Sequence, residues 1–98
     1  LARIGMLLVQ GNQAIAPQNR RIVNAVMMTC GLYQASARFA VEVGLPTKSG
    51  VSGAILSIVP TQGAIACYSP VLDATGNSKA GIFLLQQLAR NLNLSIFG

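Results

Sequence analysis

The sequence predicts an α+β sandwich within the broad α/β class: helices, then an antiparallel hairpin, then a C-terminal helix. Three observations predict it. Apolar residues recur at helical spacing over 18–30 and again after Ser78. Between these segments lie two compact apolar runs, joined by a short turn that ends in glycine. The chain has 98 residues, which is enough for one small domain.

Apolar spacing and the residues that end each run place the first three helices. The first is expected over about 1–10, where Gly11 ends it. The second is expected over 17–30, because Pro17 suits a first helical position. The residues of its apolar stripe, expected to be buried, are Ile22, Val23, Val26 and Met27. A short third helix is expected over about 34–41.

The two strands of the hairpin are expected over 54–59 and 64–68, with a turn over 60–63. Neither strand alternates polar and apolar residues, so we expect both faces of both strands to be covered. Pro70 ends the second strand, since proline cannot donate to the ladder.

A surface loop over 73–77 follows the hairpin and leads to the last helix. Ser78 is a good N-cap residue for that helix. The residues of its expected buried stripe are Gly81, Leu85, Leu88, Ala89 and Leu92.

Composition restricts the possible partners. The chain is 52% hydrophobic and 9% charged, with a net charge of +5. Apart from the pair Arg20 and Arg21 the basic residues are scattered, and nucleic-acid binding requires a basic patch, so we expect no nucleic-acid partner. No apolar run reaches the roughly 18 residues of a membrane span, so we expect no membrane partner. Cys30 and Cys67 are expected to be two buried free thiols in a reducing, cytoplasmic compartment.

The titratable residues exclude several kinds of chemistry. The chain has no histidine, so it cannot by itself build a Ser-His-Asp or Cys-His arrangement. Its two acids, Glu42 and Asp73, are poor material for a carboxylate pair, and we expect no metal site. The groups that remain available for chemistry are hydroxyl, amine and main-chain groups.

Two segments carry candidate site residues. In Lys48-Ser49-Gly50, a strand edge would present N–H groups to a reacting carbonyl, while the lysine supplies charge and the glycine keeps the wall thin. The alternative is a turn into a strand with a solvated lysine. Tyr33 follows the helix-breaking Gly31 and stands at an element boundary. Its alternative is a half-buried core tyrosine.

Taken together, the segments 27–33, 43–51 and 68–81 resemble the serine-dependent glutaminases, and the resemblance extends over essentially the whole chain. It implies the fold of serine β-lactamases and transpeptidases, with 1–98 as the C-terminal segment of a single, longer catalytic domain. It also implies hydrolysis of L-glutamine to L-glutamate and ammonia through a serine acyl-enzyme, in a homo-oligomer and without cofactors.

The resemblance also implies roles for individual residues. Tyr33 matches a catalytic, substrate-contacting tyrosine that can shuttle a proton, and Val51 matches a residue whose main-chain N–H helps to form the oxyanion hole. Lys48, Ser49 and Gly50 match a supporting wall. No serine of the chain has lysine three residues later, so the nucleophile would lie upstream and the segment alone would be inactive.

Several positions depart from the family pattern. Gln34 stands where aspartate is common and Ala37 where glycine is common. Ser52-Gly53-Ala54 replaces a run of glycines, and its added side chains are expected to narrow the site wall. Two alternatives stay open: another penicillin-recognising type of serine hydrolase, and a non-catalytic binding module.

Overall fold

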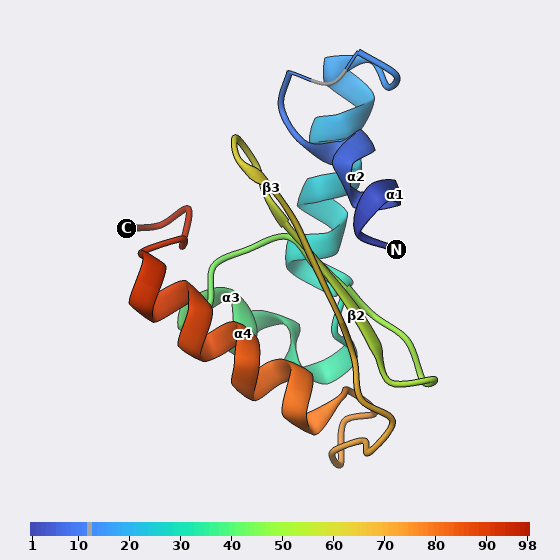
Figure 1. The fold of residues 1–98 in the computed structure, drawn as a ribbon, viewed down its shortest axis with the longest axis vertical. Helices are drawn as coiled ribbons and strands as arrows, with labels where there is room; N and C mark the ends of the chain where they lie inside the picture. The colour runs from blue at the N-terminus through green and yellow to red at the C-terminus, as the bar shows by residue number, and fades with distance from the viewer. Residues whose placement is uncertain (12) are drawn as a thin grey trace.

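The computed structural model describes residues 1–11 and 13–98, and it places a small antiparallel sheet between two helical layers (Figure 1). The strands of the sheet, in their spatial order, are β1 (Thr47–Ser49), β2 (Ala54–Val59) and β3 (Gly63–Tyr68). The predicted hairpin of β2 and β3 is confirmed, with Ile55 opposite Cys67. The three-residue strand β1 adds to it, with Lys48 opposite Leu56.

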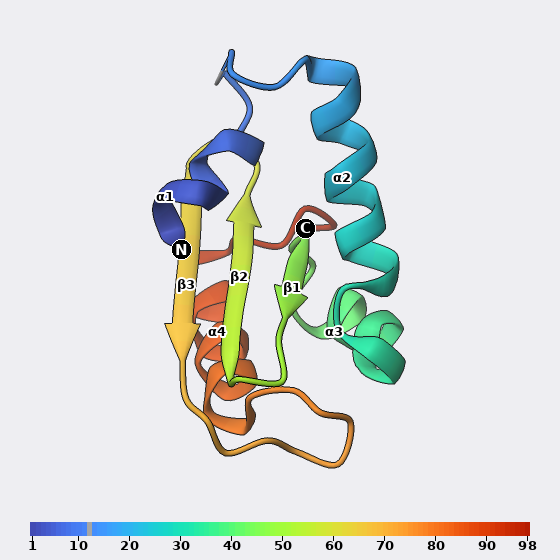
Figure 2. The same ribbon diagram turned by 90° about the vertical axis from the view of Figure 1, so that its right-hand side faces the viewer.

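Helices cover both faces of the sheet (Figure 2). One layer consists of α3 (Ser36–Glu42) and α4 (Lys79–Leu92), and the other of α1 (Ala2–Gly5) and α2 (Pro17–Cys30). Two short 3₁₀ turns, η1 (Met6–Leu8) and η2 (Tyr33–Ala35), precede α2 and α3. No helix in the described part of the chain is both long enough and apolar enough to cross a membrane.

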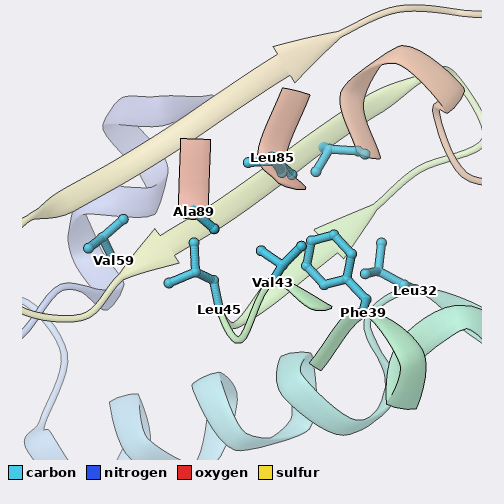
Figure 3. Packing of buried hydrophobic residues seen from close by; sticks show 8 residues of the cluster. Leu32, Phe39, Val43, Leu45, Val59, Leu85 and Ala89 are labelled. Atoms are coloured by element: carbon cyan, nitrogen blue, oxygen red, sulfur yellow. The ribbon is translucent and has the colours of Figure 1, made fainter. Parts of the chain in front are cut away.

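The central strand β2 is buried on both of its faces, as predicted. Ile55 and Val59 point into the layer of α3 and α4, while Leu56 and Ile58 point into the layer of α1 and α2. Alternate residues of a strand face opposite sides, so one continuous apolar run supplies both clusters. Figure 3 shows the larger cluster, whose buried residues are Leu32, Phe39, Val43, Leu45, Ile55, Val59, Leu85 and Ala89.

The prediction that β3 is covered on both faces is wrong. β3 has a single neighbouring strand, and the exposed fraction of the Tyr68 side chain is 71%. Ala64 and Ile65 pack against the two clusters, one on each side, but Ala66 is exposed. The helical layers therefore cover only the first part of this edge strand, and its end at Tyr68 is exposed.

Two helical predictions also need correction. The first helix ends at Gly5 and passes into η1, so it does not continue through residue 10. α2 begins at Pro17 as predicted, but of its expected buried stripe only Met27 is buried. The exposed stripe residues are Ile22, Val23 and Val26. The sheet ends at the short strand β1, and the N-terminal half of α2, which includes Ile22 and Val23, extends past it (Figure 2).

The last helix follows its prediction at its start. The Ser78 hydroxyl accepts a hydrogen bond from Gly81 N–H at 3.1 Å, which confirms the cap. Gly81, Leu85 and Ala89 are buried, but Leu92 in the last turn is 61% exposed, so the buried row ends at Ala89.

Both cysteines are free, as predicted, but they are not buried. Cys30 is exposed at the end of α2, and Cys67 is only partly buried, at the edge of the sheet. Partial burial raises the pKa of the Cys67 thiol, because it disfavours the charged thiolate.

Gly31→Ala is expected to destabilise the protein, because a β-carbon there would lie 1.8 Å from the Thr47 carbonyl oxygen. The loop must move away from β1, so we expect the free energy of unfolding, measured in urea, to fall by about 3 kcal/mol or more. In the control Gly63→Ala the nearest atom would be Met6 Sδ at 3.9 Å, and we expect a change below about 1 kcal/mol. Equal losses in the two variants would contradict this account.

Candidate functional site

The end of α2 meets strand β1 through one main-chain carbonyl group. The Gly31 oxygen accepts a hydrogen bond from Ser49 N–H at 3.1 Å and another from Lys48 Nζ at 3.3 Å. Lys48 Nζ also donates to the Ser49 main-chain oxygen. Because Gly31 has no side chain, its backbone approaches β1 closely enough for these bonds. Lys48 and Ser49, both predicted site residues, are therefore tied to the segment that leads to Tyr33.

Tyr33 has a backbone conformation that is uncommon for residues other than glycine. Its φ angle is 57°, in the left-handed region. The buried Ser36 holds this conformation: its hydroxyl donates to the Tyr33 carbonyl oxygen at 2.8 Å and accepts from Leu32 N–H at 3.0 Å. Such strained residues persist only where their surroundings hold them, and they concentrate at functional sites.

The ring of Tyr33 faces the ammonium group of Lys48. Nζ lies 4.9 Å from the ring centroid, which is within the range of a cation–π interaction. The Tyr33 side chain is 47% exposed and belongs to neither hydrophobic cluster. It is therefore not a core tyrosine, and its phenol is accessible.

The residues after Ser49 form the tight turn between β1 and β2. Gly50 N–H donates to the Ala54 carbonyl oxygen at 2.9 Å and closes the turn. Val51 lies in this turn with its side chain 73% exposed, and among the described residues its main-chain N–H has no acceptor. A free N–H at such a place can donate to a ligand oxygen. No hydrogen bond or ring contact joins Val51 to Tyr33 within the described chain. Val51 belongs to the same region because it follows Ser49 by two residues.

A cavity of about 190 Å³ opens beside β1. The residues that line it are Leu1, Lys48, Ser49, Gly50, Ala54 and Leu56. Three of these are predicted site residues. Of the side chains expected to narrow the wall, Ala54 lines the cavity, whereas Ser52 is exposed and lies outside the lining.

The loop over 73–77 packs against the site, although the sequence indicated only a surface loop. Asn77 is 0% exposed. Its Nδ2 donates to the Leu32 carbonyl oxygen at 2.9 Å, and its Oδ1 accepts a hydrogen bond from Ser49 Oγ. The loop therefore contacts both the segment before Tyr33 and strand β1.

Sequence reasoning missed Asn77. An asparagine between glycine and an N-cap serine is typical of an ordinary turn. The one available signal was its place within 68–81, a segment that carries the family resemblance. Gly76, beside it, lies against the Tyr33 ring: a β-carbon there would be 3.8 Å from Tyr33 Cε2.

The two acidic residues are engaged in local hydrogen bonds. The Asp73 carboxylate accepts from Thr75 Oγ1 at 2.6 Å and from Thr75 N–H at 2.8 Å, and these bonds lower the pKa of Asp73. Glu42 accepts from Arg38 at 2.6 Å and from Gln86 at 2.6 Å, and the Arg38 bond is the largest cause of the lowered pKa of Glu42. Among the described residues, no three His, Cys, Asp or Glu side chains lie close enough together to hold a metal ion.

Comparison with known proteins gives one consistent match. A family model described as Glutaminase matches residues 1–97. The chain is 48% identical over 97 residues to a glutaminase of Alkaliphilus oremlandii (strain OhILAs) and 50% identical over 97 residues to a glutaminase of Clostridium tetani (strain Massachusetts / E88). Each alignment covers 99% of this chain and 32% of the relative, so the chain spans about a third of the length of these relatives.

Solved structures match as well. One is a Bacillus subtilis glutaminase in covalent complex with 5-oxo-L-norleucine, with 38% identity and a TM-score of 0.92, covering 98% of this chain and 38% of that chain. Another is a Bacillus glutaminase in the presence of 4.3 M NaCl, with 39% identity and a TM-score of 0.92, covering 98% of this chain and 36% of that chain. These matches confirm the predicted α+β class.

The loop that carries Asn77 is expected to loosen in acid. The folded state lowers the pKa of Asp73, so this stabilisation is fully present above the unfolded pKa of about 3.9 and is lost as the pH falls through the lower folded value. The amide proton resonance of Thr75, followed by NMR from about pH 6 to about pH 2, should report the loss.

Thr75→Val is the matched control, because it removes the hydroxyl that contributes most to the shift. The pKa of Asp73 should then move toward its ordinary value. A titration midpoint at or above that ordinary value in the unsubstituted protein would contradict the assignment.

Proposed function

The chain belongs to the glutaminase family, and from this premise we propose that it forms the C-terminal segment of one catalytic domain that hydrolyses L-glutamine to L-glutamate and ammonia. The family matches and the exposed pair of Tyr33 and Lys48 support this proposal. The nucleophilic serine, with lysine three residues later, belongs to another part of that domain, since no serine here has this spacing.

The reaction proceeds by two acyl-transfer steps. The serine oxygen attacks the carbon of the side-chain amide, and the serine proton passes to its lysine. The tetrahedral intermediate expels the amide nitrogen, which takes up a proton and leaves as ammonia. Water then attacks the acyl-enzyme, releasing glutamate and restoring the serine.

The observation that carries the proposal is the placement of Tyr33. Its ring is exposed and its backbone is held in a strained conformation beside the positive charge of Lys48. In the proposed mechanism the Tyr33 phenol contacts substrate and transfers the proton to the leaving nitrogen. Lys48, Ser49 and Gly50 support the wall and do not react.

Val51 contributes its main chain. Its N–H has no acceptor among the described residues, and in the proposal it donates to the oxyanion of the tetrahedral intermediate. One such donor is worth about 2.7–4 kcal/mol in the transition state. The Val51 side chain is exposed and plays no part in this step.

The proposal extends to fold, compartment and assembly. A Lys-Ser-Gly strand beside a helix-covered β2 fits the serine β-lactamase fold. Free thiols at Cys30 and Cys67 fit a reducing cytoplasm. The exposed apolar stripe of α2 fits burial in a homo-oligomer. The reaction needs neither a metal nor an organic cofactor, and nucleic acid and membrane are not partners.

The 98 residues by themselves are expected to release no ammonia from L-glutamine, because they lack the Ser-x-x-Lys nucleophile. Ammonia release is measured with a coupled assay, and the complete protein that carries this sequence is the positive control. Turnover by the 98 residues alone would contradict the assignment of the nucleophile.

Tyr33→Phe in the complete protein is expected to lower kcat for L-glutamine by about 100-fold or more, because it removes the proton-transferring hydroxyl. Tyr68→Phe is the matched control: Tyr68 is the second tyrosine of the chain and lies 71% exposed on β3. Its kcat should equal that of the unsubstituted protein. Equal kcat values in both variants would exclude the catalytic role of Tyr33.

A further inference from the structure

Asn77 is a fully buried polar side chain whose hydrogen bonds join three separate parts of the chain. Nδ2 donates to the Leu32 carbonyl oxygen at 2.9 Å and to Thr75 Oγ1 at 2.8 Å, while Oδ1 accepts from Ser49 Oγ. The bond to Leu32 joins residues 45 apart in the sequence, and the bond to Ser49 joins residues 28 apart. All of its polar atoms therefore have partners, as a buried amide requires.

These partners lie immediately beside the two side chains of the proposed site. Leu32 directly precedes Tyr33, and Ser49 directly follows Lys48. Both bonds start from one planar amide group, so the Leu32 carbonyl and the Ser49 hydroxyl are held at a fixed separation. This restraint also limits how the neighbouring Tyr33 ring and Lys48 ammonium can move relative to each other. The Lys48 nitrogen lies 4.9 Å from the centroid of the Tyr33 ring.

Tyr33 needs such a restraint more than an ordinary residue does. Its left-handed φ of 57° is unfavourable for a side chain with a β-carbon. Ser36, from within α3, accepts from Leu32 N–H and donates to the Tyr33 carbonyl oxygen, and Asn77 holds the Leu32 carbonyl from the opposite loop. The Leu32 carbonyl also accepts from Ala35 N–H at 3.1 Å, three residues later, so the Asn77 bond is the contact that ties this carbonyl to the loop over 73–77.

The loop holds Asn77 in turn. Asn77 N–H donates to Asp73 Oδ1 at 3.1 Å, and the same oxygen accepts from the hydroxyl and the N–H of Thr75. The hydroxyl of Thr75 then accepts from the Asn77 amide. Hydrogen bonds within the loop therefore hold both the main chain of Asn77, through Asp73, and its side chain, through Thr75.

We propose that Asn77 is a positioning residue of the glutaminase site, whose side-chain amide sets the Tyr33 phenol against Lys48 by joining the Leu32 carbonyl to the Ser49 hydroxyl. The inference rests on the proposed function. Asn77 acts through these neighbours and does not itself contact the substrate.

The test compares Asn77→Asp and Asn77→Ala in the complete protein. Both are expected to lower kcat for L-glutamine by about tenfold or more, with a smaller change in KM, because the proton transfer depends on the placement of Tyr33. Asn77→Asp has nearly the same volume as asparagine and keeps the oxygen that accepts from Ser49, but it loses the donor to Leu32. It therefore carries the test if Asn77→Ala fails to fold.

Hydrogen exchange gives a second readout that does not depend on activity. In Asn77→Asp, amide exchange should accelerate over 31–34 and stay unchanged over 47–49, since the bonds from Nδ2 to Leu32 and Thr75 are lost while the bond from Ser49 is kept. In Asn77→Ala it should accelerate over both segments. Val59→Ala is the stability control, because this buried core side chain lies at the end of β2 remote from Ser49.

The outcomes separate the two proposals. A kcat for the Asn77 variants within about twofold of Val59→Ala, at equal loss of Tm, would overturn the positioning role. Unchanged exchange over 31–34 in Asn77→Asp would overturn it too. If the unsubstituted protein does not hydrolyse L-glutamine, the proposed function fails, and the exchange pattern still decides whether Asn77 holds the Tyr33 segment.

Discussion

The close approach of Gly31 to strand β1 is the constraint on which the arrangement of the site depends. Its carbonyl oxygen accepts from the main chain of Ser49 and from the side chain of Lys48. The end of α2, the strand and the Tyr33 segment thus meet at one point that leaves no room for a side chain. A shift at this point would move Tyr33 relative to Lys48, because Tyr33 follows Gly31 by two residues and Lys48 is bonded to its oxygen.

Buried hydrogen bonds define the site more sharply than apolar packing would. Ser36, Ser49 and Asn77 are all buried, and each has a partner of defined direction. Leaving such a group without a partner costs about 1–3 kcal/mol, so alternative arrangements of this region are disfavoured. Apolar contacts lack this directionality, and the hydrophobic clusters on the two faces of β2 serve to hold the layers together.

Elements whose signals are local could be predicted from the sequence. Pro17 marks the start of α2, Ser78 caps α4, and one uninterrupted apolar run forms the doubly covered strand β2. Coverage by distant segments could not be predicted. The stripe of α2 has the right period yet leaves Val26 exposed, because periodicity shows that a face is apolar and not which segment packs on it. Tyr33 and Lys48 were candidates from their local sequence, and the family resemblance supplied their roles, but their contact needed the fold.

Asn77 escaped sequence reasoning for a related reason. Much of the site consists of main-chain groups: the Gly31 and Leu32 carbonyl groups and, in the proposed mechanism, the Val51 N–H. Such groups do not depend on which side chain their residue carries, so an unusual residue such as Gln34 leaves them in place. They do depend on the residues that direct the backbone. The geometry of the site therefore depends on side chains that do not contact the substrate. Asn77 is such a side chain, because it bonds both to the segment before Tyr33 and to strand β1.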